Sequence, residues 1–294
     1  GLCLTVTGIR RLKLLWQMLP VSNSCLRRPP IVSPVTTASS LPLTGERTAP
    51  GIVEENYWFR RHEAAYRWVA DTFKTELAAG IALDAGCGEG YGIDLLSSGR
   101  PLAAIGLELD APSALHAATN YGNAIAVARA NLDRLPIRSN SVALLVSMQV
   151  IEHLWDLPAF LSECRRIVED QGVCIFTTPN RLTFSPGLGR GQKPLNPFHV
   201  EEFDADQLQN LVADAGFASV HCLGLSHGPR LTTWEASNGS IIDAQVRAAV
   251  TGQQWSRDLA ATVAGVGVDD FEIGSGDINS ASDLLVVARP GTSL

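Results

Sequence analysis

The stretch Leu83-Asp84-Ala85-Gly86-Cys87-Gly88-Glu89-Gly90-Tyr91-Gly92 decides the fold of this chain. The apolar run 80–83 precedes it and the apolar run 93–96 follows it, so the pattern predicts a strand, a glycine-rich turn and a helix. Glycines at alternate positions leave the backbone open to a ligand and allow dihedral angles that other residues avoid. Because the N–H groups at the start of a helix attract anions, we expect a pocket for a carboxylate or a phosphate here.

The spacing of the glycines narrows the choice of ligand. A dinucleotide fingerprint would need a glycine at Tyr91, and a phosphate-binding loop would need a Gly-Lys-Ser/Thr end. What remains is D-x-G-x-G-x-G, formed by Asp84, Gly86, Gly88 and Gly90. It resembles the first motif of class I S-adenosylmethionine (SAM) methyltransferases, where this turn holds the methionine part of the cofactor. The alternative is an ordinary glycine-rich turn between a strand and a helix.

An acidic residue follows at the distance that a ribose ligand requires. The apolar run 102–107 predicts a second strand with Glu108 at its carboxyl end, 22 residues after Gly86. An acid there can accept both hydroxyls of a ribose. We expect Glu108 to do so, with Asp110 as the alternative, since either acid could instead cap the helix that begins near Pro112.

Length and composition are those of a globular protein. The chain has 294 residues, 46% of them hydrophobic, and its formal net charge of −7 argues against a nucleic-acid partner. The six cysteines show no zinc spacing and are expected to be reduced thiols of a cytoplasmic protein. Residues 1–43 are basic and then rich in Pro, Ser and Thr; Gln17 and Pro20 interrupt their apolar run, so we expect a disordered tail rather than a signal peptide or membrane span.

The rest of the chain alternates between strand and helix patterns, which predicts an α/β fold with a parallel sheet. Strands are expected over 102–108, 124–129, 141–148, 173–178, 218–225 and 282–289, in addition to the strand before the glycine turn. Helices are expected through Tyr66, Val69 and Phe73, over 92–98, 112–120, 158–169 and 204–215, and around 241–250 and 255–263, with a turn at Gly172.

Two further segments contribute candidate residues of the cofactor site. The segment 130–136 resembles the "D-x-x-x-L-P" region of the same methyltransferases, which implies that Asn131 approaches the adenine amino group and Leu132 lies against the adenine ring. The alternative for Asn131 is a plain turn residue. Glu152 and His153 follow the strand 141–148, where active sites of open α/β sheets lie. The stretch resembles the E-x-x-E-H motif of quinone-pathway O-methyltransferases, some of which use both acids and the His around a metal. Gln149 replaces the first acid here, so we count it with the cofactor site and expect no dedicated metal.

Candidate acceptor contacts lie in three segments. The irregular loop 179–203 offers Asn196, His199 and Glu202; its alternative is a flexible insertion in which His199 caps the next helix. Three consecutive aromatic residues begin at Tyr57, and Arg60 and His62 follow them; the aromatics could equally pack the first helix on the sheet. The insertion 226–281 should form a wall of the acceptor site, with His227, Arg230, Trp234 and Asp243 as its contacts.

From Leu43 to Pro290 the chain resembles actinobacterial SAM-dependent methyltransferases associated with methylated polysaccharides, in particular those encoded with mycobacterial methylglucose lipopolysaccharide biosynthesis. The segments that carry the resemblance are LTGERT, ENYWFRRH, AGCGEGYG, ANLDRLP, QVIEHLWD, TTPN, NPFH, HGPRL and GSIIDAQ. The resemblance implies one methyltransferase domain over 44–290, with tails at 1–43 and 291–294. It also implies a seven-stranded, mostly parallel Rossmann-like sheet whose last strand is antiparallel, and O-methylation of a glucose hydroxyl, with the 6-position as candidate.

For this reaction we expect His153 to act as the general base, with His199 as second choice and Glu152 orienting the imidazole. The expected partner is a sugar or oligosaccharide, without nucleic acid or stable membrane insertion; the oligomeric state is not predicted. Two alternatives remain: a methyltransferase of a lipid or quinol-like small molecule, and a non-catalytic SAM-binding partner of a polysaccharide-synthesising complex. Methylation of DNA amino groups is disfavoured, because the Asn/Asp-Pro-Pro-aromatic motif is absent after 141–148.

Overall fold

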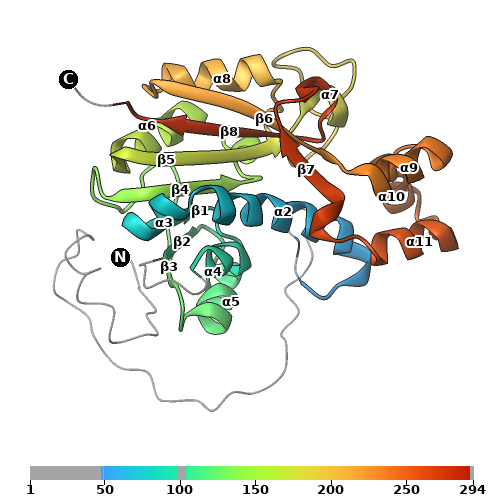
Figure 1. The fold of residues 1–294 in the computed structure, drawn as a ribbon, viewed down its shortest axis with the longest axis horizontal. Coiled ribbons are helices and arrows are strands. Elements are labelled where there is room, and N and C mark those ends of the chain that lie inside the picture. The colour runs from blue at the N-terminus through green and yellow to red at the C-terminus, as the bar shows by residue number, and fades with distance from the viewer. Residues whose placement is uncertain (1–47, 49, 98–103, 292–294) are drawn as a thin grey trace.

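A computed structural model describes residues 48, 50–97 and 104–291 (Figure 1). One sheet of eight strands forms its centre, in the order β3-β2-β1-β4-β5-β8-β6-β7. The strands are β1 (Ala82–Ala85), β2 (Ala104–Glu108), β3 (Ala126–Arg129), β4 (Val142–Met148), β5 (Val168–Pro179), β6 (Ser219–His227), β7 (Phe271–Gly274) and β8 (Asp283–Arg289). The expected tail 1–43, most of the segment LTGERT, the first residues of the strand expected over 102–108, and residues 292–294 lie outside the described residues.

The sheet confirms the expected Rossmann-like fold and adds one strand to it. β1 pairs in parallel with β2 and β4, β2 with β3, and β4 with β5. The last strand, β8, lies antiparallel between β5 and β6. The eighth strand is β7, which comes from the 226–281 insertion and pairs antiparallel with β6 at the sheet edge. The sequence analysis did not predict β7, which lies inside the insertion and pairs only with β6 in the sheet.

Helices cover both faces of the sheet (Figure 1). They are α2 (Asn56–Thr72), α3 (Lys74–Ala79), α4 (Tyr91–Ser97), α5 (Ala111–Tyr121), α6 (Leu157–Ile167), α7 (Arg181–Phe184), α8 (Ala205–Asp214), α9 (Pro229–Asn238), α10 (Ile241–Thr251) and α11 (Arg257–Ala264). Short 3-10 turns complete the fold: η1 (Val53–Glu55), η2 (Ile151–His153), η3 (Val268–Asp270) and η4 (Ile278–Ser280). The helix α9 was not predicted, because Thr232, Thr233 and Ser237 weaken its helical pattern.

Alternating strand residues build two hydrophobic layers. On one face α6 and α8 pack against side chains such as Leu83, Leu145 and Phe176. On the other face α2, α3 and α4 belong to a second layer with side chains such as Leu144 and Ile175, and this layer continues through α2 into α11. Both faces of the central strands are therefore buried, as a parallel sheet requires.

Two sequence expectations about β5 are wrong in detail. The helix α6 ends at Ile167 rather than continuing to 169, and the strand begins at Val168 rather than at Val173. Gly172, expected in a turn, lies inside β5 beside an irregularity in the β4–β5 register. A Cβ there would lie 2.7 Å from Val168 Cγ2 and 2.9 Å from the Val142 carbonyl oxygen, so the position requires glycine for close packing.

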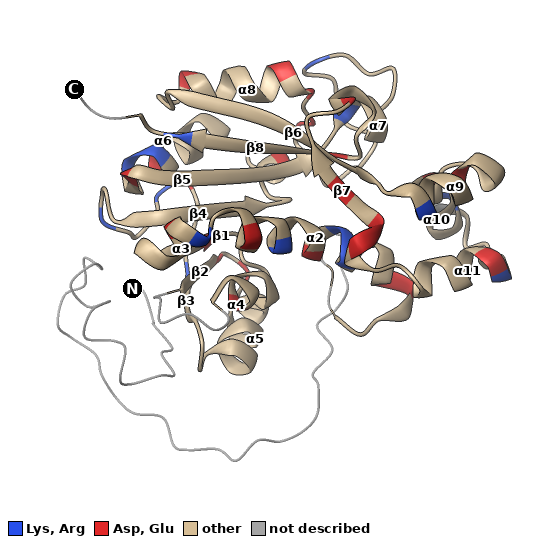
Figure 2. Ribbon diagram, in the orientation of Figure 1, with Lys and Arg blue, Asp and Glu red and all other residues tan. Residues whose placement is uncertain are grey.

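The loop after α7 and the α9–α11 insertion both lie at the end of the sheet where β4 and β5 terminate (Figure 1). This edge is where open α/β sheets bind their ligands. The edge strand β7 and the turn before it carry Asp269, Asp270 and Glu272, shown in red in Figure 2. No helix within the described residues combines the length and hydrophobicity that a membrane span needs.

Candidate active site

The glycine-rich turn is held against the second strand by its own backbone. The amides of Gly86 and Cys87 both donate to the Leu107 carbonyl at 2.9 Å. Gly86 has a φ of +92°, and a Cβ on it would lie 2.5 Å from Val150 Cγ2. A Cβ on Gly88 would meet nothing within 4 Å, so the turn is open on that side. The turn therefore leaves room for a ligand to contact the main chain there.

Asp84 lies under this turn with one carboxyl oxygen unsatisfied. Its Oδ2 accepts a 2.8 Å hydrogen bond from Tyr66 Oη, whereas its buried Oδ1 has no hydrogen-bond partner within the part of the chain that the structure describes. Burial raises the pKa of Asp84 to about 7. Gly92 makes this arrangement possible, since a Cβ there would lie 2.1 Å from Tyr66 Cζ. A ligand ammonium group would satisfy Oδ1, so these residues fit the amino-acid end of SAM.

Glu108 and Asp110 take different roles in the structure. Glu108 Oε2 accepts from the Gly88 amide at 2.9 Å, which places the carboxylate at the turn. Asp110 caps α5 by accepting from the Ser113 amide at 3.1 Å. The helix-cap alternative therefore applies to Asp110, and Glu108 stays the predicted ribose ligand.

The residues predicted to contact adenine follow β3. Asn131 Nδ2 donates to Asp133 Oδ2 at 2.9 Å, and its Oδ1 lies 3.3 Å from the Asp133 amide, so Asn131 forms the turn that was its alternative interpretation. Leu132 is buried in the hydrophobic layer under α6, which gives it a packing role. Contacts of both residues with adenine stay predictions. Cys87, Cys164, Cys174 and Cys222 are buried free thiols, as expected.

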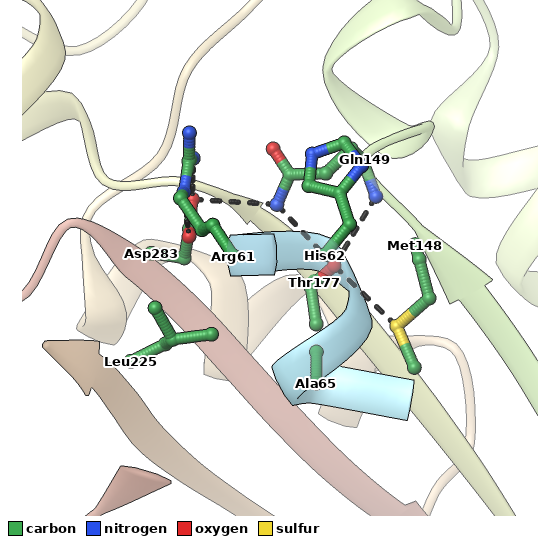
Figure 3. Close-up of a pocket in the computed structure, with 8 residues that line it drawn as sticks. All are labelled: Arg61, His62, Ala65, Met148, Gln149, Thr177, Leu225 and Asp283. Carbon is green, nitrogen blue, oxygen red and sulfur yellow. Dashed lines mark hydrogen bonds and ion pairs between the residues drawn. The ribbon is translucent and has the colours of Figure 1, made fainter. Parts of the chain in front are cut away.

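Gln149 follows β4 beside a small cavity lined by Arg61, His62, Ala65, Met148, Gln149, Thr177, Leu225 and Asp283 (Figure 3). It adopts a φ of +55°, which is uncommon for a residue other than glycine. Its Nε2 lies 3.3 Å from both Thr177 Oγ1 and Asp283 Oδ1. Asp283 is also paired with the buried Arg61 guanidinium through two nitrogens. Nothing in the sequence pattern marked Arg61, Thr177 or Asp283 as residues of this region.

His62 faces the same cavity (Figure 3). Burial, with a smaller contribution from Arg61, lowers the pKa of His62 to about 3. Its Nδ1 lies 3.4 Å from Thr48 Oγ1 and 3.5 Å from Tyr91 Oη, at the long limit of hydrogen bonding. The imidazole is therefore neutral around pH 7, and Tyr91 connects it to the start of α4.

The residues predicted to be catalytic meet beyond β4. Glu152 and His153 belong to η2, and His199 comes from the loop after α7. The rings of His153 and His199 lie 5.0 Å apart between centroids. His153 Nδ1 is 3.2 Å from the Phe198 carbonyl oxygen, whereas Nε2 is 4.0 Å from Glu152 Oε1, beyond hydrogen-bonding distance. The Phe198 carbonyl is therefore the nearer polar partner of the His153 imidazole, and the orienting role of Glu152 stays a prediction. Burial raises the pKa of Glu152 to about 8.

The loop is tied to this cluster at several points. The amides of Val200 and Glu201 approach the Glu152 carbonyl oxygen at 2.7 and 3.3 Å. His199 Nδ1 lies 2.6 Å from Glu202 Oε1, and Asn196 Nδ2 lies 2.9 Å from His199 Nε2. Asn196 and Glu202 thus position His199 in this structure. Asp204, not His199, caps α8, so the helix-cap alternative for His199 is wrong.

The other predicted acceptor residues have partners inside the protein. Tyr57 is fully buried, and its hydroxyl lies 2.7 Å from His227 Nε2, whose Nδ1 is 2.8 Å from Glu235 Oε2. Two of the others form ion pairs, Arg60 with Glu63 at 2.5 Å and Arg230 with Asp270. The last two donate hydrogen bonds, Trp234 Nε1 to Asp258 at 2.6 Å and the Asp243 amide to Ser240 Oγ at 3.1 Å. These contacts fasten the insertion to α2 and to itself. A role in acceptor binding stays a prediction for each.

Comparison with known proteins agrees with this geometry. A model of the methyltransferase domain family matches residues 83–176, from β1 to β5. A "probable S-adenosylmethionine-dependent methyltransferase" of Mycobacterium tuberculosis is 45% identical over 269 residues, covering 89% of this chain and 94% of that protein. A protein described in the same words from Mycolicibacterium smegmatis is 45% identical over 257 residues, covering 86% and 96%.

A solved structure shares the fold. It is a SAM-dependent methyltransferase and possible histamine N-methyltransferase from Thermotoga maritima, with a TM-score of 0.53 and 17% identity, covering 81% of this chain and 94% of that one. The chain belongs to the SAM-dependent methyltransferases, and its cofactor is S-adenosylmethionine.

Proposed function

We propose that the protein transfers the methyl group of SAM to a hydroxyl of a glucan or oligosaccharide, with the 6-hydroxyl of glucose as the candidate position. The observation that carries this proposal is the convergence of His153, His199 and Glu152 next to the glycine turn. Val150, whose side chain packs against Gly86, is joined to His153 by a 3.0 Å backbone hydrogen bond. The sugar acceptor is supported by the resemblance to methyltransferases associated with methylated polysaccharides.

The bound SAM supplies a methyl group on a positively charged sulfur. The turn at Gly86 and Gly88, the Asp84 Oδ1 atom and the Glu108 carboxylate would hold its amino-acid and ribose parts. Fixing the acceptor oxygen in line with the methyl group can account for about 7–11 kcal/mol of the barrier. A general base contributes a further factor of about 10²–10⁴. Positioning thus lowers the reaction barrier more than the base does. The contribution of the base, however, can be measured by a single substitution.

His153 is the proposed base because its geometry leaves Nε2 as the acceptor atom. The Phe198 carbonyl at Nδ1 favours the tautomer with the proton on Nδ1, so the lone pair is on Nε2. The imidazole is about 30% exposed, so a hydroxyl can reach it from solvent. His199 is buried and held by Glu202 and Asn196, which makes it better suited to positioning than to proton transfer.

The test is methyl transfer from labelled SAM to methylglucose oligosaccharides, compared with a panel of quinols, with the product identified by mass spectrometry. His153→Ala should lower kcat by about 10²–10⁴ while SAM affinity, measured by calorimetry, stays unchanged. His221→Ala is the matched control, because His221 is an exposed imidazole on β6. Equal losses of turnover and SAM affinity would make His153 structural instead.

The second candidate acceptor is a lipid or quinol-like small molecule. Exposed apolar side chains at Trp155, Leu195 and Phe198 near the cluster favour it. Faster transfer to a quinol than to the oligosaccharides would replace the sugar proposal. Absence of turnover with every acceptor, despite SAM binding, would favour a non-catalytic SAM-binding role.

A further inference from the structure

Three potential metal ligands come together at the cluster beyond β4. One ligand atom each from Glu152, His153 and His199 lies within 4.8 Å of the other two. The expectation of no metal rested on Gln149, which replaces the first acid of the sequence motif. Gln149 is directed instead toward Thr177 and Asp283, and His199 supplies the third donor from a segment more than forty residues later in the chain.

Both imidazoles are oriented as metal-ligating histidines are. His199 Nδ1 lies 2.6 Å from the Glu202 carboxylate, and His153 Nδ1 lies 3.2 Å from the Phe198 carbonyl oxygen. An acceptor at Nδ1 keeps the proton there and directs the Nε2 lone pair toward the ligand. Asn196 Nδ2 is 2.9 Å from His199 Nε2, so a cation would have to turn this amide away.

Glu152 provides the independent observation. The residue is 1% exposed, and its Oε2 has no hydrogen-bond partner among the described residues. A buried carboxyl oxygen without a partner costs free energy, about 1–3 kcal/mol or more when charged. The other oxygen, Oε1, lies 4.0 Å from His153 Nε2, so a cation held there by both carboxylate oxygens would also provide Oε2 with a partner.

We propose that Glu152, His153 and His199 bind one divalent transition-metal cation such as Zn²⁺ or Co²⁺. Two imidazoles with one carboxylate suit these cations, whereas Mg²⁺ and Ca²⁺ prefer oxygen ligands. Three protein ligands leave a coordination position open to water or to another ligand.

Metal binding at this site has a consequence for catalysis, which rests on the proposed function. The cation occupies the Nε2 lone pair of His153, the atom proposed to take the proton from the acceptor hydroxyl. A bound cation and an imidazole base therefore exclude each other. Saturation of the site should stop base-assisted methyl transfer.

The binding test does not depend on activity. Co²⁺ is added to the metal-free full-length protein, and visible absorption is recorded, since bound Co²⁺ absorbs far more strongly than the aqueous ion in a site of low coordination number. We expect saturation at one equivalent, with affinity reduced at least tenfold in His199→Ala and Glu152→Gln. His221→Ala should bind as the parent protein does. Thermal unfolding of each variant checks that it is folded.

A second variant covers the case in which removal of a ligand unfolds the protein. Glu202→Gln keeps all three ligands and removes only the carboxylate behind His199, so affinity should fall about 10–100-fold. No Co²⁺ absorption, or equal affinity in the parent protein, His199→Ala and Glu202→Gln, would overturn the site.

Activity provides a separate result. If methyl transfer occurs, Zn²⁺ should inhibit it, and the Zn²⁺ concentration for half-inhibition should equal that for half-saturation of the metal site. Full activity at saturating Zn²⁺ would show that a bound cation and the His153 base do not exclude each other. If no acceptor is methylated, the proposed function fails, whereas the absorption titration still decides whether the metal site exists.

Discussion

The contact between Gly86 and Val150 allows a quantitative test of how the glycine turn is built. In Gly86→Ala the new Cβ would lie 2.5 Å from Val150 Cγ2, and the backbone would keep a φ of +92°. An L-residue in a left-handed conformation costs about 1–2 kcal/mol, and overpacking costs about 1–3 kcal/mol. The free energy of unfolding should therefore fall by about 2–5 kcal/mol. SAM affinity should fall too, because the turn shifts.

A double-mutant cycle separates the overpacking cost from the cost of the left-handed backbone conformation. Val150→Ala removes both methyl groups that the new Cβ would contact, so Gly86→Ala/Val150→Ala should recover the overpacking term, a coupling energy of about 1–3 kcal/mol. Gly88→Ala is the matched control: its Cβ meets nothing within 4 Å, and only the backbone cost of about 1 kcal/mol should appear. Urea unfolding followed by circular dichroism measures all four variants. If the effects of the two substitutions add within about 0.5 kcal/mol, the proposed contact is wrong.

Three further predictions concern the cavity beside Gln149 and the cluster at His153. Because burial lowers the pKa of His62 from 6.5 to about 3, the unfolded chain binds more protons between these values. Stability should thus decline as pH falls below 6.5, by at most about 1.4 kcal/mol per pH unit, and His62→Gln should flatten the decline in urea unfolding at several pH values; parallel curves would contradict this. Arg61→Met should cost about 3–5 kcal/mol, since it leaves the buried Asp283 carboxylate unpaired, and Arg61→Met/Asp283→Leu should restore most of it in thermal unfolding; no recovery would count against the ion-pair explanation. Trp155→Ala should change stability by less than about 0.5 kcal/mol, because the side chain is 90% exposed, while raising the acceptor KM and not the SAM dissociation constant; an unchanged KM would place the acceptor elsewhere.

The sequence was sufficient to predict the half of the fold that binds the cofactor. Buried parallel strands are continuous apolar runs, and the turn at Gly86 needs residues without side chains, so both features appear as local patterns. The carboxyl-terminal part of the fold was less predictable. The strand β7 is held by its pairing with β6, and α9 by Leu231 and Trp234 in the hydrophobic layer, and both contacts depend on the tertiary fold.

The chemical site shows the same division. Glu152 and His153 could be chosen as candidates because they lie in the turn η2 soon after β4. Two other contacts could not be predicted, because they form only in the folded protein. His199 contacts Glu202, and Arg61 pairs with Asp283. The sequence identified Asn196 and Glu202 as polar loop residues, but it could not show that they contact His199.

The position of β8 also has a consequence for how the polypeptide matures on the ribosome. The strands β5 and β6 are both made before β8, yet they are joined in the sheet only through it. The first five strands can associate as they emerge, whereas β6 and β7, which pair with each other, can join the sheet only after β8 has emerged. Asp283, at the start of β8, brings the counterion of Arg61 at the same moment. Arrest of translation before residue 283 should therefore yield a chain whose amino-terminal half resists protease and whose carboxyl-terminal half does not.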